Sequence, residues 1–193
     1  MEYYGTNYNY RTVKINKCCN LGTIQGKMEF IGGIAGSVGH IYNSYNVGNV
    51  SGSGIVARYW SCISNCYNFG ETSKAGIATP MYALKDETIT NVYTINKVKG
   101  TKPIRESGSW CALGENVFYP TSLGNFDTAE GTAIEDMLMK SDGSNDTENE
   151  KALITLLNEY VTKYNNQNKE NEEFIELCNW IIDPDTGYPI INF

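Results

Sequence analysis

The chain has 193 residues, of which 41% are hydrophobic and 19% charged, and its formal net charge is −7. This composition is typical of a folded domain and excludes a natively disordered chain. The acidic balance argues against nucleic acid and anionic membrane surfaces as partners, because both require basic patches. No apolar run approaches the roughly 20 residues that span a bilayer.

The amino-terminal residues Met1–Gly5 have neither the basic nor the apolar region of a signal peptide. The sequence therefore predicts either an intracellular protein or a part of a longer secreted chain. We expect the second, because the pattern described next begins abruptly.

The first half of the chain is internally repetitive. Three segments align without gaps and a weaker fourth copy follows; they begin at Ile15, Ile41, Ile63 and Ile89. A second, glycine-rich element recurs between them, at residues 31–36, 53–57 and 75–78. Self-similarity at a step of 22 to 26 residues is the signature of a repeat architecture, and this step is too short for a helical hairpin.

Aligned copies form columns of like residues. The apolar columns are Ile15/Ile41/Ile63/Ile89, Leu21/Val47/Phe69/Ile95 and Ile24/Val50/Thr72/Val98, beside a column of small residues, Cys18/Ser44/Cys66/Val92. The polar columns are Asn43/Asn65/Asn91, Asn20/Asn46/Asn68 and Gly22/Gly48/Gly70. Apolar columns allow each coil to bury its face against its neighbours, and Asn and Gly suit tight corners. The sequence predicts a mainly β protein: a short β-solenoid of about four coils over residues 1–100, of either hand.

The alternation of I-x-N-[CS]-Y-N-x-G-x-[IV]-x-G with G-G-I-A-G resembles the GLUG repeat of bacterial surface proteins, over roughly residues 10–100. The later part is similar to the segment that commonly follows such repeats, here Met137, Leu156-Leu157-Asn158, Trp180 and Gly187-Tyr188-Pro189. The resemblance implies an extracellular module of a larger bacterial envelope protein. Thr94 and Asn96 depart from the motif, so we expect the array to end near residue 100.

Residues 101–193 are expected to form a small α+β cap over the open end of the solenoid. Short extended pieces are predicted around Trp110–Leu113 and Val117–Tyr119. Thr132–Glu135 and Thr147–Glu150 have the spacing of helix capping boxes, and the second precedes a helix to about Tyr164 with one apolar face. A strand, turn and strand are predicted over Phe174–Phe193.

No metal or cofactor site is expected. The six cysteines match no zinc spacing, and Cys18 and Cys66 fall in the small column, where packing explains them. Cys18 and Cys19 have no assignable disulfide partner. The acidic run Asp142–Glu150 lacks the later glutamate of a calcium loop and precedes a helix, where carboxylates are favoured.

Catalysis is not expected either. Acids within the coils are few (Glu29, Glu71, Asp86, Glu87), none forms a column with another, and His40 has no assignable partner. The candidate ligand-binding residues are the aromatic column Tyr45, Tyr67 and Tyr93. Pointing outward, they would form a strip that stacks on sugars or anchors a protein; pointing inward, they are core.

Three functions follow from these observations. We expect a non-catalytic cell-surface module that acts as a spacer or adhesion segment, with a glycan or protein as surface ligand. The alternatives are a carbohydrate-binding module that uses an exposed tyrosine ladder, and a polysaccharide-active solenoid enzyme.

Overall fold

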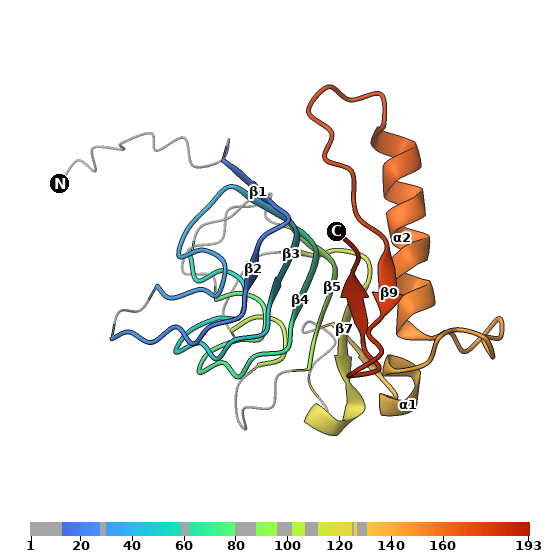
Figure 1. Cartoon of the computed structure of the whole chain (residues 1–193), viewed down its shortest axis with the longest axis horizontal. Coiled ribbons are helices and arrows are strands. Elements are labelled where there is room, and N and C mark those ends of the chain that lie inside the picture. Colours follow the sequence, from blue (N-terminus) through green and yellow to red (C-terminus); the bar gives the residue numbers. More distant parts are fainter. Residues whose placement is uncertain are drawn as a thin grey trace.

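The computed structural model describes residues 13–27, 30–58, 62–79, 88–95, 102–106, 112–124, 126 and 131–193. The fold is mainly β, a parallel solenoid of about three turns that carries a helix and a hairpin along one side (Figure 1). This confirms the predicted solenoid architecture and comes close to the expected four coils.

One face of every coil contributes to a single parallel sheet. Its strands are β1 (Lys14–Asn16), β2 (Cys19–Asn20), β3 (His40–Asn46), β4 (Cys62–Asn68), β5 (Thr88–Thr94), β6 (Ala112–Leu113), β7 (Val117–Pro120) and β8 (Thr132–Ile134). The order is β1-β3-β4-β5-β7-β8, with β2 beside β3 and β6 beside β5. The glycine-rich elements form a second line of parallel bridges, such as Gly32 with Ser53 and Val56 with Ala78.

The register of the sheet reproduces the columns of the sequence. Ile15 pairs with Ile41, Ile41 with Ile63, and Ile63 with Ile89. The last three isoleucines are fully buried inside the coils, together with Val92 and Cys66. The isoleucine and small-residue columns are therefore the solenoid core. The column of Leu21 and Val47 differs from the expectation, because both side chains are exposed.

The three middle strands contain a left-handed residue at the same position. Asn43, Asn65 and Asn91 have φ of 46°, 56° and 50°, and each follows an outward-facing residue such as Tyr42. Asparagine tolerates this conformation better than most residues. It kinks the strand, so that two consecutive side chains face outward before the alternation resumes at Ser44 and Tyr45.

A second asparagine column lies inside the coils. The Asn20 Nδ2 donates to Asn46 Oδ1 at 2.6 Å, and the Asn46 Nδ2 donates to Asn68 Oδ1 at 2.6 Å. The neighbouring glycines must lack a side chain, since a Cβ on Gly48 would lie 1.9 Å from the Gly22 carbonyl oxygen. The coils thus stack backbone on backbone at this corner.

The parallel sheet extends beyond residue 100, where the sequence places a domain boundary. β6 and β7 pair with β5, and β8 pairs with β7 up to Ile134. β6, β7 and β8 therefore complete the solenoid, and the cap proper begins at α1 (Asp136–Met139). The predicted extended pieces correspond to β6 and β7, although Trp110 and Cys111 lie outside the described residues.

The cap consists of α1, the helix α2 (Leu153–Asn168) and the hairpin of β9 (Trp180–Ile182) with β10 (Pro189–Ile191). A 3₁₀ turn, Thr121–Leu123, precedes it. The expected capping box at Thr132 is wrong, because Thr132 lies in β8 and no side chain caps α1. At the second box the Thr147 hydroxyl accepts a hydrogen bond from the Glu150 amide, but it closes a turn that ends before the helix begins.

Candidate binding surface

The tyrosine column faces away from the solenoid core. Register pairs Tyr45 with Tyr67 and Tyr67 with Tyr93, and their rings stack at centroid distances of 4.8 and 5.7 Å. The column is longer than its sequence indicates, because Cys19 pairs with Tyr45 at one end and Phe118 with Tyr93 at the other.

The cap covers most of this column. Tyr67 and Tyr93 are 3% and 0% exposed, while Tyr45 is half-buried. The Trp180 ring packs against both buried tyrosines at 5.8 and 5.7 Å, and the Tyr93 hydroxyl donates to the Pro189 carbonyl. The exposed three-ring ladder that the carbohydrate-binding alternative requires is therefore not present.

Burial raises the pKa of the phenols in this column. Loss of solvation raises the pKa of Tyr67 and Tyr93 well above the usual value near 10, because the charged phenolate cannot be solvated there. The same effect raises the pKa of Tyr42, which lies against Cys62. These groups stay neutral over the physiological range.

The left-handed asparagines fasten the cap to the sheet. The Asn43 side chain donates to the Glu176 carbonyl at 2.9 Å and accepts from the Cys178 amide at 2.8 Å. Asn65 donates to the Cys178 carbonyl at 2.9 Å and accepts from the Trp180 indole at 2.6 Å. We call the outward amides of Asn43, Asn65, Asn91 and Asn116 the asparagine seam.

The seam continues to the helix. Asn91 and Asn116 donate to the carbonyls of Leu157 and Leu156 at 3.3 and 2.7 Å. Along the seam each Nδ2 also donates to the preceding coil, for example Asn65 to Asn43 at 2.8 Å and Asn91 to Asn65 at 2.7 Å. The repeat contains three members of this column, but nothing in it indicates what an outward amide will contact.

The residues that carry the C-terminal resemblance meet one another here. Asn158 donates to the Trp180 carbonyl at 3.0 Å and accepts from the Trp180 amide at 2.8 Å. Gly187 has φ of 75° in the hairpin turn, and Lys140 lies over the Tyr188 ring at 4.5 Å. Met137 is the exception, because it is 78% exposed while Met139 is buried in its place. These residues thus join the helix, the hairpin and α1 of the cap to one another.

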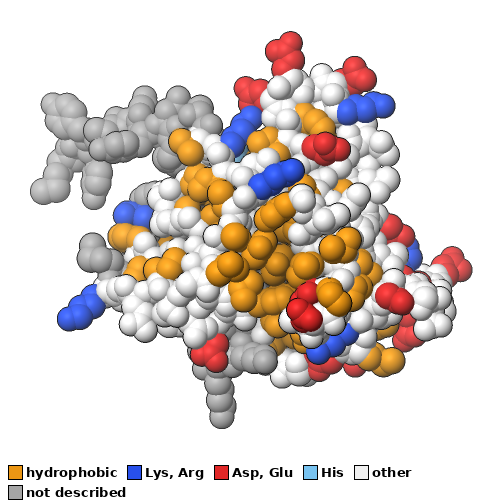
Figure 2. All heavy atoms as spheres, viewed as in Figure 1, with side chains coloured by type: hydrophobic (Ala, Val, Ile, Leu, Met, Phe, Trp, Pro, Cys, Tyr) orange, Lys and Arg blue, Asp and Glu red, His pale blue; other side chains and the backbone are white. Residues whose placement is uncertain are grey.

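A hydrophobic strip remains open beside the cap. Figure 2 shows hydrophobic side chains gathered over β3–β5 and the C-terminal hairpin. Phe193 is 52% exposed and stacks on Tyr45 at 5.6 Å, with the planes 22° apart. The exposed Leu21 and Val47 belong to the next outward column of the same coils. We call Tyr45 and Phe193 together the aromatic platform.

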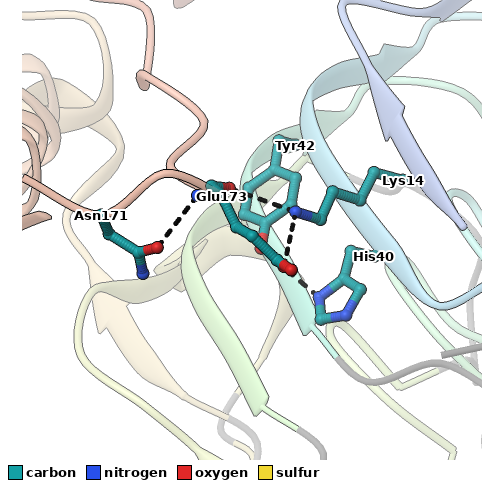
Figure 3. Close-up of polar contacts among 5 residues, drawn as sticks. All are labelled: Lys14, His40, Tyr42, Asn171 and Glu173. Atoms are coloured by element: carbon teal, nitrogen blue, oxygen red, sulfur yellow. Dashed lines mark hydrogen bonds and ion pairs between the residues drawn. The ribbon is translucent and has the colours of Figure 1, made fainter. Parts of the chain in front are cut away.

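A polar cluster ties the segment before the hairpin to the first coil (Figure 3). Lys14 Nζ donates to the Glu173 carbonyl and carboxylate, both at 3.1 Å, and the Glu173 amide donates to Asn171 Oδ1 at 2.9 Å. His40 Nδ1 lies 3.4 Å from the Tyr42 hydroxyl. The Glu173 side chain is 82% exposed, so this ion pair is an attachment in solvent.

Two acids share a hollow beside α2, where Asp142 and Glu159 lie in the lining with Lys163. A polar groove crosses three coils through Asn49, Ser51, Glu71 and Ser73, and Glu71 is its single described carboxylate. No set of three His, Cys, Asp or Glu side chains among the described residues could hold a metal ion. Asp142 and Asp146 accept hydrogen bonds from the backbone amides of Ser144 and Ala152. Glu29, Asp86 and Glu87 lie outside the described residues.

The five described cysteines, Cys18, Cys19, Cys62, Cys66 and Cys178, are free thiols. Of the helices in the described ranges, none combines the length and apolarity needed to cross a membrane.

Comparison with protein-family models, with curated proteins and with solved structures found no match to this chain.

Proposed function

We propose that the chain is a non-catalytic repeat module of a bacterial cell-surface protein, where it acts as a spacer or interaction segment of a larger envelope protein. The observation that carries the proposal is the use of the aromatic column and the asparagine seam in docking the cap. Side chains that would form a ligand platform on a bare solenoid serve here to hold the cap on the coils.

A polysaccharide panel tests the proposal. The chain is incubated with bacterial, plant and animal polysaccharides, and both retained glycan and newly formed reducing ends are measured. We expect neither. Release of reducing ends that persists after repurification would contradict a non-catalytic module, whereas retention without cleavage would favour the candidate described next.

A second candidate is glycan binding at the aromatic platform. Two exposed, nearly parallel rings offer the apolar surface on which a sugar ring stacks, and Tyr45 and Phe193 lie 5.6 Å apart. This platform is smaller than the three-ring ladder expected from sequence.

Matched variants test the platform. If it binds a glycan, Tyr45→Ala and Phe193→Ala should each weaken retention at least about tenfold, as loss of a central contact does. Met137→Ala removes a hydrophobic side chain on α1 that is more exposed than either ring, and it should leave retention unchanged. Equal retention by all three variants would exclude the platform.

A further inference from the structure

The first coil, residues 13–27, presents positions that every later coil buries. Cys18 is exposed, whereas Ser44 and Cys66 in the same column are 0% exposed. Asn20 is half-buried, whereas Asn46 and Asn68 are fully buried. The side of this coil that faces away from β3 therefore carries the residue types that contact a neighbouring coil elsewhere in the solenoid. The described residues place no coil against this side.

Gly22 gives the most specific indication. Gly48 and Gly70 occupy the same column, and a Cβ on either would lie within 2.0 Å of the carbonyl oxygen of the preceding coil's glycine. Their lack of a side chain is thus imposed by the coil before them. A Cβ on Gly22 would meet only its own neighbour Asn20, at 3.9 Å. Among the described residues nothing requires glycine there, but a coil stacked on this side would.

The hydrogen-bonding groups of the first coil are oriented to accept from, and donate to, a coil ahead of it. Within the coils, each inner asparagine donates Nδ2 to the next coil, from Asn20 to Asn46 and from Asn46 to Asn68. The Asn20 Oδ1 instead accepts the amide of Gly22 in its own coil, at 3.1 Å. Likewise the amides of Tyr45 and Val47 donate to Cys18 and Asn20, so the equivalent amides of Cys19 and Leu21 face the open side.

We propose that this edge docks a further coil of the same Asn- and Gly-cornered type, carried ahead of the first coil in the same polypeptide. Its inner asparagine donates to Asn20 Oδ1, and its corner glycine carbonyl lies against Gly22. The inference deepens the proposed function, on which it rests, because it makes the module the capped end of a longer stack.

The structure disfavours a second copy as the occupant. Residues 13–27 contain three lysines, Lys14, Lys17 and Lys27, and no acid, so two such edges face to face would bring like charges together. A copy stacked head to tail would make the protection of this edge depend on protein concentration.

An extended chain tests the proposal. A copy of residues 39–52, which contain no lysine, placed directly before Met1 puts a copied Ile41 26 residues ahead of Ile15, which is the step between Ile15 and Ile41. Amide hydrogen exchange of Cys19 and Leu21, measured by NMR, reports docking. We expect exchange at least about tenfold slower in the extended chain than in the 193-residue chain, because the amides become paired and buried.

Gly22→Ala is the matched variant. It should leave the unfolding midpoint of the 193-residue chain unchanged and abolish the added protection in the extended chain. Gly48→Ala, whose Cβ meets a carbonyl in either chain, should lower the midpoint of both.

Two results would overturn the inference. Unchanged exchange in the extended chain means that no coil docks, and concentration-dependent protection in the 193-residue chain means that a second copy does. Polysaccharide cleavage alongside normal protection would contradict the proposed function alone, so the two failures are distinguishable.

Discussion

An asparagine side chain offers one donor and one acceptor group at a fixed separation, and it tolerates a left-handed backbone. Both properties are used at Asn65. Its φ is 56°, its amide donates to Asn43 and to Cys178, and its carbonyl accepts from Asn91 and from Trp180. One residue therefore shapes the strand, links three coils and holds the cap.

The first prediction separates these roles. Asn65→Ala should lower the free energy of unfolding by about 3 kcal/mol, because buried partners lose hydrogen bonds and alanine is strained at positive φ. Asn65→Gly loses the same bonds without the backbone strain and should cost about 1 kcal/mol less. Urea denaturation measures both. Equal losses would show that the backbone conformation contributes nothing.

The repeat alone predicted part of the positions of the asparagine and glycine residues in the coils. The columns of Asn46 and Gly48 lie at a corner, as expected, whereas Asn43, Asn65 and Asn91 lie within strands and kink them. What each outward side chain contacts could not be predicted, because Tyr45 and Tyr67 are identical in motif yet one is half-buried and the other 3% exposed. The difference comes from the cap, whose Trp180 packs on Tyr67 from more than 100 residues further along the chain.

At the scale of elements, the cap replaces solvent on the outward face of the coils. Its hairpin covers Tyr67 and Tyr93, and α2 contributes Leu153, Leu157 and Val161 to the same cluster. Because this cluster contains side chains from the coils and from the cap, truncating a coil side chain should also loosen the cap.

Tyr67→Ala tests the cap interface. The ring contacts Tyr45, Phe69, Tyr93 and Trp180, and removing a buried aromatic side chain costs about 3–5 kcal/mol. Tyr45→Ala, from the half-buried ring, should cost about 1 kcal/mol. Chemical denaturation followed by circular dichroism measures both losses. A stable Tyr67→Ala protein would mean that the ring is not enclosed by the cap.

Asn158 tests the link between helix and hairpin. Asn158→Ala leaves the amide and carbonyl of Trp180 without their partner and should cost about 2 kcal/mol. Asn168 donates to a carbonyl of its own helix, Tyr164, so Asn168→Ala is the control and should cost about 0.5 kcal/mol or less. Native-state hydrogen exchange of the Trp180 amide should accelerate in the first variant only; acceleration in both would indicate general loosening.

The end of the solenoid lies further along the chain than the repeat pattern predicts. Leu113, Val117 and Phe118 occupy the columns of Ile89, Val92 and Tyr93, and Asn116 has φ of 58° like the other seam residues. They form a further degenerate coil. A gapless comparison misses it because Leu113 and Asn116 are three positions apart where Ile89 and Asn91 are two. Asn116 still forms the hydrogen bonds of the seam despite the extra residue, but the extra residue breaks the gapless alignment of the repeats.

At the scale of the whole molecule, the solenoid and its cap bury several phenols between them. Burial raises the pKa of Tyr42, Tyr67 and Tyr93 because the phenolate would lose its solvation. In the unfolded chain the same groups ionise near pH 10. The native state therefore binds more protons than the unfolded state at alkaline pH.

The last prediction follows from the sign of this difference. A raised native pKa contributes stability that is fully present below about pH 10 and is lost as the pH rises above it, by about 1.4 kcal/mol per pH unit for each buried phenol. Unfolding should therefore be cooperative in alkali, with phenolate absorbance and loss of β-sheet signal rising together. Tyr67→Phe removes one titrating group while keeping the ring, so its stability should fall less steeply with pH. If the buried phenols instead ionise near pH 10 while the sheet remains intact, the cap does not seal this face of the solenoid, and the aromatic column is open to ligands after all.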